Sequence, residues 1–458
     1  MQVSIPDKLK ALNVFLPRIY IVGGYVRNAL LGIGETDIDM CGEYTPDEVF
    51  LRLKGTFFKA VEVNKRLGTL KIYDTNDTSF EIEYTTFRRD SYLQGSGAHS
   101  PEEVKFTRSI KEDAFRRDFK VNSLYLDVAT AEIMDFTGGL ADLEKKQLST
   151  CRAPIDVFSE DGLRLLRLVR QAAELDFKIE DETFSTAKSL VGLLSDISAE
   201  RIREEFFKII VADTRYKKLD NKSAHVRGLR LLDEIGALKY ILPELLDGKG
   251  FKQDTKHHIY DIFEHNLHTY EVCPPKLRLA GLVHDIGKPA SIKKYDNMYF
   301  HAELGASIVS SRLGKNGLKL PNKEIDRLKR LILGHMYDLS GDASEKKVRM
   351  FIIKNLDIID DLIVLKRADA VASKGMQVNS VSADKLERLY KTMQNDKTPF
   401  TPRELGIDGS DLIELEINPK DRNWALQKVF ERAVCDEKCR SRDEQLDYLK
   451  GLRKNGDD

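Results

Sequence analysis

A short apolar run that ends in a glycine pair, followed by two aspartates, constrains this chain more than any other feature. Residues 19–22 (Ile-Tyr-Ile-Val) predict a buried strand because they are apolar and mostly β-branched. Gly23-Gly24 interrupts the strand and lets the backbone pass close to a ligand. Residues 25–31 then predict a short helix with Arg27 in its first turn. A second strand follows, with Asp37 and Asp39 on the same face because side chains alternate along a strand.

The two aspartates indicate a metal site. Neighbouring carboxylates repel each other unless a cation lies between them, and Mg²⁺ shares one or two carboxylates with phosphates and water. We therefore expect metal-assisted chemistry on a nucleoside triphosphate, with Asp37 and Asp39 as catalytic Mg²⁺ ligands and with Gly24 and Arg27 at the phosphates. Asp-x-Asp alone also occurs at solvated strand ends, so it is the joint pattern that favours a site.

The joint pattern resembles the core of the class II tRNA nucleotidyltransferases, the CCA-adding enzymes and the related bacterial poly(A) polymerases. That family usually has Asp after the arginine, where this chain has Asn28, a position that we expect to shape the helix. The second motif of the family is intact and comprises Arg116, Arg117, Asp118 and Asn122. Its apolar spacing favours the start of a helix, and its arginines favour triphosphate and ribose contact because Arg binds phosphate oxygens bidentately. An ion pair on a helix face is the alternative.

Residues 1–150 predict an α/β head, with further strands at 68–73, 79–84 and 133–136. Glu83 lies on one of them and is either a third catalytic carboxylate or a paired surface group. Segment 88–104 contains Gly and Ser without periodicity, and it predicts a mobile loop beside the site.

The chain becomes helical from about residue 155 to 250, in what we expect to be a neck domain over 151–250. Arg164, Arg167 and Arg170 recur at helical spacing, and Asp161 lies one turn before Arg164. The arginines are either a basic helix face or nucleotide-binding groups. In the second alternative, Asp161 and Arg164 recognise the amino group and the neighbouring ring acceptor that cytosine and adenine share. This Glu-Asp-x-x-Arg segment looks like the nucleotide-selecting motif of the family.

The neck also carries a local excess of positive charge. Residues 201–230 hold nine Lys or Arg against four Asp or Glu. Such runs are commonly solvated helix faces, but this one is also the best candidate for gripping an RNA backbone.

Histidines gather in the next segment, which we expect to be a metal-dependent domain over 251–395. Seven of the nine histidines fall between 257 and 335. Imidazoles and carboxylates in this order are typical of a divalent-metal centre that activates water against a phosphoester. The series resembles the HD phosphohydrolase domain, and its expected ligands are His265, His284, Asp285, His301, His335 and Asp369. The metal is not identified by the sequence, and we expect His257 and His258 to be structural.

The composition restricts how the protein can bind a partner and where it is located, but it does not identify a function. The formal net charge is −1, so an RNA partner must bind a local patch. We expect no membrane span, no signal peptide, and five reduced cysteines in a cytoplasmic protein. Residues 396–458 predict a helical tail, which in the resembled family contacts tRNA.

The resemblance implies addition of CCA to tRNA from CTP and ATP, with no obligate protein partner evident. The alternatives are an enzyme that adds only A or poly(A), or an HD phosphohydrolase that acts on RNA ends.

Overall fold

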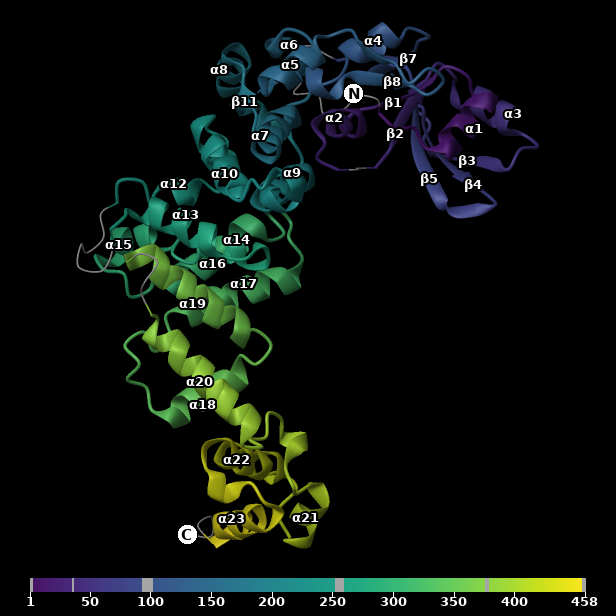
Figure 1. Cartoon of the computed structure of the whole chain (residues 1–458). Helices are drawn as coiled ribbons and strands as arrows, with labels where there is room; N and C mark the ends of the chain where they lie inside the picture. The colour runs from purple at the N-terminus through teal and green to yellow at the C-terminus, as the bar shows by residue number, and fades with distance from the viewer. Residues whose placement is uncertain (1–2, 35–36, 93–101, 252–258, 375–378, 455–458) are drawn as a thin grey trace. The chain divides into compact units, whose positions relative to one another are not determined.

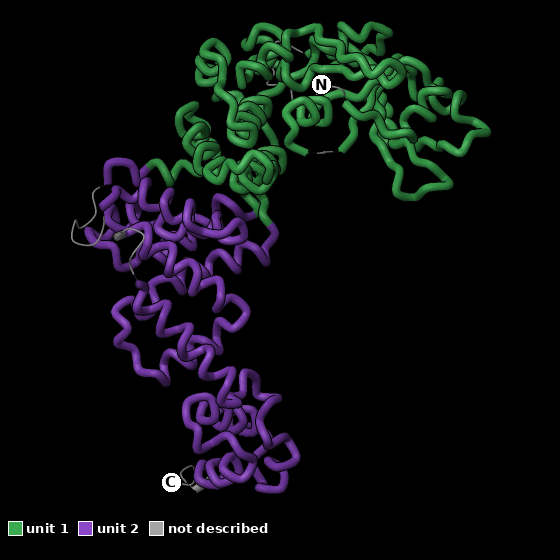
Figure 2. Tube along the Cα trace, in the orientation of Figure 1, with its two compact units in different colours: residues 1–246, 315–320 green, residues 247–314, 321–458 purple. Residues whose placement is uncertain are grey.

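The computed structural model describes residues 3–34, 37–92, 102–251, 259–374 and 379–454. Figure 2 shows that the chain divides into two compact units, residues 1–246 with 315–320 and residues 247–314 with 321–458. This division is coarser than the four segments expected from the sequence. The expected fold class, an α/β head followed by helical domains, is confirmed (Figure 1).

The head is built on a mixed sheet with the strand order β3-β4-β5-β2-β1-β8-β9. The strands are β1 (Ile19–Val22), β2 (Asp39–Gly42), β3 (Phe58–Asn64), β4 (Thr69–Asp74), β5 (Asp77–Thr86), β8 (Leu124–Asp127) and β9 (Ile133–Asp135). β2 and β5 are parallel, and the other neighbouring strands in this sheet are antiparallel. All four residues of the interior strand β1 are buried, as its uniformly apolar sequence requires.

The glycine pair ends β1 and starts α2 (Gly24–Leu31), as predicted. Gly23 has φ +81°, a conformation that glycine adopts without strain. The prediction that both aspartates lie on the second strand is wrong for Asp37, because β2 begins at Asp39. The last residue of β1, Val22, pairs with Asp39, and the chain then turns away at Gly23, so β1 offers no partner to Asp37.

The remaining helices of the head flank the sheet, and α3 shows how the local sequence starts one. Thr45 caps α3 through a reciprocal capping box with Glu48, and Pro46 occupies the first turn. These helices are α1 (Asp7–Phe15), α3 (Pro46–Leu53), α4 (Ile110–Phe115) and α5 (Gly139–Lys145).

Two predictions for the head need correction. The second motif does not start a helix, because α4 ends at Phe115 and leaves a 3₁₀ turn at Lys120–Asn122 before β8. Segment 88–104 is not wholly a loop either. β6 (Arg88–Ser91) and β7 (Glu103–Phe106) pair as an antiparallel ribbon, since backbone pairing does not require the apolar alternation that the segment lacks. Residues 93–101 of that segment lie outside the described residues.

The neck is helical apart from one short strand pair, β10 (Gln147–Leu148) with β11 (Lys178–Ile179). Its helices are α6 (Pro154–Glu160), α7 (Leu163–Leu175), α8 (Asp181–Ser189), α9 (Ala199–Ile210), α10 (Ala224–Glu234), α11 (Leu238–Ile241) and α12 (Pro243–Leu246). Leu163, Leu166 and Val169 form the expected buried stripe on α7, and Arg164 on the same helix is buried as well.

The second unit consists of helices in the described residues. They are α13 (Ile262–Val272), α14 (Arg278–Val283), α15 (Lys288–Tyr295), α16 (His301–Leu313), α17 (Asn322–His335), α18 (Glu345–Lys354), α19 (Ile359–Lys374), α20 (Val381–Asn395), α21 (Gly409–Glu414), α22 (Arg422–Cys435) and α23 (Arg442–Lys454). One apolar cluster joins α18 and α20 to α22 and α23, so it extends across residue 396. None of the helices in the described residues combines the length and the apolar character needed to cross a membrane.

Candidate functional site

A cavity of about 280 Å³ in the first unit collects most of the predicted phosphate and metal residues, and we call it the aspartate pocket. The predicted residues that line it are Gly24, Arg27, Asp37, Asp39, Arg117, Asp118, Asn122, Arg167 and Arg170. They come from α2, from β2 and the residues before it, from the second motif and from α7. The fold therefore brings three sequence motifs to one cavity, although the lining residues Gly24 and Arg170 are 146 positions apart.

Carboxylates crowd one side of this pocket. Asp39 and Glu83 are directly opposite each other in the parallel pair of β2 and β5. Desolvation, and then the neighbouring charges of Glu83 and Asp37, raise the pKa of Asp39. Glu83 is beside Asp39, but it is not among the described residues that line the pocket. Such an accumulation of negative charge, with oxygen ligands, fits a hard divalent cation such as Mg²⁺.

Arg27 faces the pocket with an unusual set of partners. Its guanidinium donates to Asn28 Oδ1 (2.9 and 3.0 Å), Asn122 Oδ1 (2.6 Å) and Tyr216 Oη (2.8 Å). Each of these acceptors is neutral, so the positive charge of this buried side chain is not offset by a hydrogen-bonded carboxylate. Asn28 thus supports Arg27 rather than a metal, which agrees with a role in shaping the helix.

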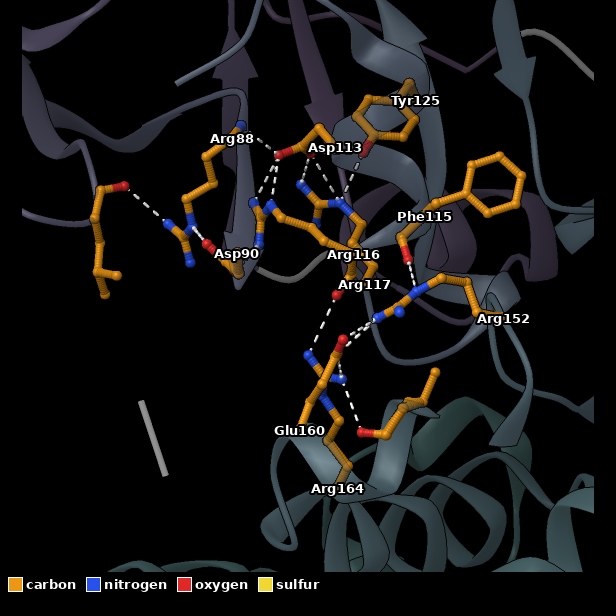
Figure 3. Close-up of polar contacts among 12 residues, drawn as sticks. Arg88, Asp90, Asp113, Phe115, Arg116, Arg117, Tyr125, Arg152, Glu160 and Arg164 are labelled. Carbon is orange, nitrogen blue, oxygen red and sulfur yellow. Dashed lines mark hydrogen bonds and ion pairs between the residues drawn. The ribbon is translucent and has the colours of Figure 1, made fainter. Parts of the chain in front are cut away.

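The two arginines of the second motif share one buried carboxylate, Asp113 (Figure 3). Arg116 and Arg117 donate to it at 2.7 and 3.0 Å, and the Tyr125 hydroxyl donates at 2.6 Å. Burial alone would raise the pKa of Asp113, but the two guanidinium groups hold it well below its usual range. Sequence reasoning missed Asp113, although its spacing of three and four residues from the arginines was the available signal.

A larger cavity of about 480 Å³ adjoins the first, and we call it the selector pocket. Arg117, Asp118 and Arg167 line both cavities, while Asp161, Arg164 and Arg116 line only the selector pocket. The two cavities therefore join at the second motif, and the sequence-predicted phosphate and base groups occupy adjacent spaces.

Each arginine of α7 has its own acidic partner. Arg164 donates to Glu160 (2.8 Å) and to the carbonyl oxygens of Val157 and Arg116. Figure 3 shows Glu160 between Arg164 and Arg152. Arg167 donates to Asp118 at 2.6 Å, and Arg170 donates to Glu205 and Glu174 at 2.6 and 3.0 Å. The three arginines are buried or half-buried in this network, so the interpretation as a solvated basic face is wrong.

Asp161 is held from another helix. Its Oδ2 accepts from Arg201 of α9 at 2.7 Å, and its Oδ1 accepts the backbone N–H of Leu163 at the start of α7. Both contacts fix the carboxylate at the edge of the selector pocket. Its pairing with Arg201 was not predicted, because the two residues are 40 positions apart.

The six predicted ligands of the second unit lie together at one centre. His265, His301, His335 and Asp369 are on α13, α16, α17 and α19, and His284 and Asp285 directly follow α14. The Nε2 atoms of His265 and His284 are 3.2 Å apart. Asp369 Oδ1 lies 3.1 Å from His265 Nε2, and Asp285 Oδ2 lies 3.3 Å from the same atom. On the other side, Asp285 Oδ1 is 3.2 Å from His301 Nε2 and 3.5 Å from His335 Nε2. Asp285 therefore lies between two groups of ligands.

Three imidazoles at this centre are oriented by contacts between their Nδ1 atoms and backbone carbonyl oxygens. His284 Nδ1 contacts the Gly281 carbonyl at 2.8 Å, and His301 and His335 contact carbonyls three residues earlier in the same way. These contacts direct each Nε2 to the centre, as is usual for metal-binding histidines.

Charge at the centre also fits a cation. Asp285 Oδ1 and His301 Nε2 are buried and form no hydrogen bond with the described residues, although they face each other. Burial alone would lower the pKa of His284, but Asp285 and Asp369 raise it to about 10. A divalent metal would satisfy both carboxylates and the lone pairs of the histidines.

Family comparisons agree with this organisation. Residues 19–149 match the poly A polymerase head domain, residues 176–248 match the probable RNA and SrmB-binding site of polymerase A, and residues 258–374 match the HD domain.

The chain is also similar to curated CCA-adding enzymes over about half of its length. It is 40% identical to the enzyme of Enterococcus faecalis over 219 residues, which cover 46% of this chain and 52% of that enzyme. It is 37% identical to the enzyme of Lactococcus lactis subsp. lactis over 229 residues, which cover 50% of this chain and 53% of that enzyme. The match thus spans about half the length of these relatives.

Solved structures extend the likeness of the fold to the whole chain. The Bacillus stearothermophilus CCA-adding enzyme in complex with CTP superposes with a TM-score of 0.64 at 22% identity and covers 99% of both chains. The Thermotoga maritima CCA-adding enzyme complexed with tRNA gives a TM-score of 0.58 at 18% identity, over 99% of this chain and 97% of that one. The chain therefore matches the poly A polymerase head domain over residues 19–149 and the HD domain over residues 258–374, and it has the fold of the CCA-adding enzymes.

Proposed function

We propose that this chain adds CCA to tRNA 3′ ends from CTP and ATP, without a nucleic-acid template. The observation that carries the proposal is the meeting of Asp37 and Asp39 with an uncompensated Arg27 in the aspartate pocket, which continues into the selector pocket. The names of the relatives support it, since they are CCA-adding enzymes and solved examples contain CTP or tRNA.

Asp37 and Asp39 would hold Mg²⁺, with Glu83 adding negative charge beside Asp39. Bound there, the metal would lower the pKa of the RNA 3′-hydroxyl and offset charge on the triphosphate as pyrophosphate leaves. Gly24 at the start of α2 and the Arg27 guanidinium would bind phosphate oxygens. Arg116 and Arg117, held by Asp113, would stabilise further negative charge from the second motif.

Asp161 and Arg164 would select the base in the selector pocket. A carboxylate accepts from the amino group of cytosine or adenine, and a guanidinium donates to the neighbouring ring acceptor. Uracil and guanine do not present these groups in that order. Arg201 and Glu160, which bind the two selecting residues, would keep their geometry fixed while the base changes. Arg167, Arg170, Asp118 and Asn122 would complete the wall between base and phosphates.

The test is nucleotide incorporation by the purified chain with Mg²⁺, one labelled nucleotide at a time, on tRNA transcripts that end before CCA, after C and after CC. The proposal expects two C and then one A, with UTP and GTP refused. Addition of A alone to the CC-ended transcript, or of long A tails, would replace it with an A-adding or poly(A)-adding enzyme. Incorporation of UTP and GTP as efficiently as CTP would refute the role of Asp161 and Arg164.

A second function is favoured by the six-residue centre. We propose that the HD domain binds one or two divalent metal ions through His265, His284, Asp285, His301, His335 and Asp369 and hydrolyses phosphoesters at RNA ends. The metal would supply an activated water, and the position of Asp285 between two ligand groups supports two ions. The test is phosphate release from RNA with a 2′,3′-cyclic or 2′-phosphate end. Equal release by the native chain and His284→Ala would refute it.

The same proposal includes the tRNA partner, the domain boundaries and the location of the protein. The tRNA would contact the basic neck segment 201–230 and the tail 396–458. Boundaries near residues 150, 250 and 395 would separate the head, the neck, the HD domain and the tail. All five cysteines are free thiols, which supports a cytoplasmic location.

A further inference from the structure

Two residues of the neck reach the aspartate pocket although no motif pointed to them. Arg215 and Tyr216 lie between two short 3₁₀ turns, Ala212–Thr214 and Lys217–Leu219, and both line the cavity beside Asp37 and Asp39. Tyr216 is 189 positions from its hydrogen-bond partner Arg27. These two residues therefore extend the neck wall of the pocket beyond the α7 arginines Arg167 and Arg170.

The charge of Arg215 distinguishes it from most arginines in this pocket. Arg117, Arg167 and Arg170 are paired with Asp113, Asp118 and Glu174, respectively. Arg215 has no hydrogen-bonded or ion-paired carboxylate among the residues that the structure describes, and Arg27 has only neutral partners. Neither guanidinium is therefore ion-paired with a carboxylate among the described residues, although the Glu174 carboxylate acts electrostatically on both.

Tyr216 is close to both of these cations. Its ring centroid is 5.9 Å from Arg27 Cζ and 5.7 Å from Arg215 Cζ, and its hydroxyl accepts from Arg27 at 2.8 Å. The ring is buried, so its position is fixed by packing. An aromatic ring attracts a guanidinium group but does not neutralise it. Both guanidinium groups therefore remain available to bind an anionic ligand in the pocket.

We propose that Arg215 binds the terminal phosphates of the incoming nucleoside triphosphate, and that Tyr216 is a positioning residue that holds Arg27 at the same phosphates. This inference rests on the proposed nucleotidyl transfer and adds a second segment of the neck to its phosphate site. The triphosphate is the anion that the pocket fits, because Arg27 and Arg215 share the cavity with the two metal-type carboxylates. A guanidinium also matches phosphate oxygens in geometry.

The experiment measures the affinity of the full chain for CTP and for CMP in the presence of Mg²⁺ and without RNA, by titration calorimetry. In Arg215→Ala, we expect CTP affinity to fall about tenfold or more, the loss typical of one charge-assisted contact. CMP lacks the terminal phosphates, so its affinity should not change. Arg215→Lys should restore part of the CTP affinity. Lys239→Ala removes an exposed neck cation that lines neither pocket, and it should bind both nucleotides normally.

Several outcomes would overturn the inference. Unchanged CTP affinity in Arg215→Ala would do so, and so would an equal loss of CTP and CMP affinity, which indicates general damage. Normal CTP binding with weakened tRNA binding would assign Arg215 to the RNA backbone instead. In each case normal incorporation by the native chain would leave the proposed function standing, whereas a native chain that incorporates no nucleotide would refute both.

Tyr216→Phe tests the positioning role separately. Loss of the hydroxyl releases one Arg27 contact, so kcat for C addition should fall several-fold while the affinity for CMP stays unchanged. A kcat equal to that of the native chain would refute this role.

Discussion

Asp113 supports both arginines of the second motif, and removing its charge is the most informative perturbation of the head. Asp113→Asn keeps the size of the side chain and one carbonyl oxygen, but it leaves Arg116 and Arg117 without their shared counter-charge. Arg116 then retains only Asp90, whose Oδ2 lies 3.7 Å away, and Arg117 retains the Tyr125 hydroxyl at 2.9 Å.

The expected cost follows from the burial of the ion pairs. The Asp113 side chain is fully buried, and both arginine side chains are less than one-fifth exposed. Removing one partner of a buried ion pair typically costs about 3–5 kcal/mol, since the remaining charge is left uncompensated. We expect about 3 kcal/mol here, because Asn still accepts a hydrogen bond and Asp90 offsets part of the charge of Arg116. That loss is a large fraction of the stability of a domain.

Hydrogen exchange of backbone amides measures this loss within the head. The central strands β1 and β8 should exchange about a hundredfold faster in Asp113→Asn, which corresponds to the expected loss of about 3 kcal/mol. The single tryptophan, Trp424 on α22, reports on the second unit, and its unfolding by urea should not change. The arginines would also be displaced, so incorporation should fall.

Glu81→Gln is the matched control in the same sheet. Glu81 and Lys71 form an ion pair at 2.6 Å whose side chains are about half exposed, and such a pair contributes about 0–1 kcal/mol. If Asp113→Asn changed the exchange of β1 and β8 no more than Glu81→Gln does, the reasoning about the buried pair would be refuted.

Three further predictions concern the two metal centres and a buried lysine. Asp37→Ala should abolish nucleotide incorporation and leave tRNA affinity nearly intact, and normal incorporation would contradict the mechanism. Mn²⁺ at one hundred times its Kd should stabilise the second unit by about 2.7 kcal/mol, which would raise the unfolding temperature of the native chain. Asp285→Ala should abolish this rise in unfolding temperature. An equal rise in that variant would show that the metal binds elsewhere. Burial lowers the pKa of Lys366, whose Nζ donates to the carbonyls of His335 and Tyr337, to about 8. Between that pH and about 10.4 the unfolded chain binds a proton that the folded chain has released, so Lys366 makes stability rise with pH by up to about 3 kcal/mol across this window. In Lys366→Met, the free energy of unfolding in urea, followed by Trp424 fluorescence, should not show that rise with pH. If the difference in free energy of unfolding between the native chain and the variant did not change with pH, Lys366 would not titrate in this range.

The local sequence was sufficient to predict the structure where neighbouring residues alone determine it. The apolar run at 19–22 and the glycine pair predicted a buried strand and a helix start, and both were found. The order of histidines and aspartates pointed to six residues that the fold brings together, and each lies in a helix or within two residues of a helix end. Their role as metal ligands stays a prediction.

Local sequence failed where the partner of a residue lies far along the chain. Segment 88–104 shows no periodicity, yet Arg88–Ser91 pairs with Glu103–Phe106, since backbone hydrogen bonds form a ribbon irrespective of side-chain pattern. Asp37 lies outside β2 because the neighbouring strand turns away at Gly23.

The sequence by itself determined which chemical groups are present, namely two carboxylates after a glycine pair, several arginines, and an ordered series of histidines and aspartates. Only the tertiary structure decided which of the arginines have an acidic partner and which do not. Arg117, Arg167 and Arg170 have acidic partners, while Arg27 and Arg215 do not, and no spacing in the sequence distinguishes the two sets. The physical reason is that the charge available to a ligand depends on which distant side chains the fold brings within hydrogen-bond distance.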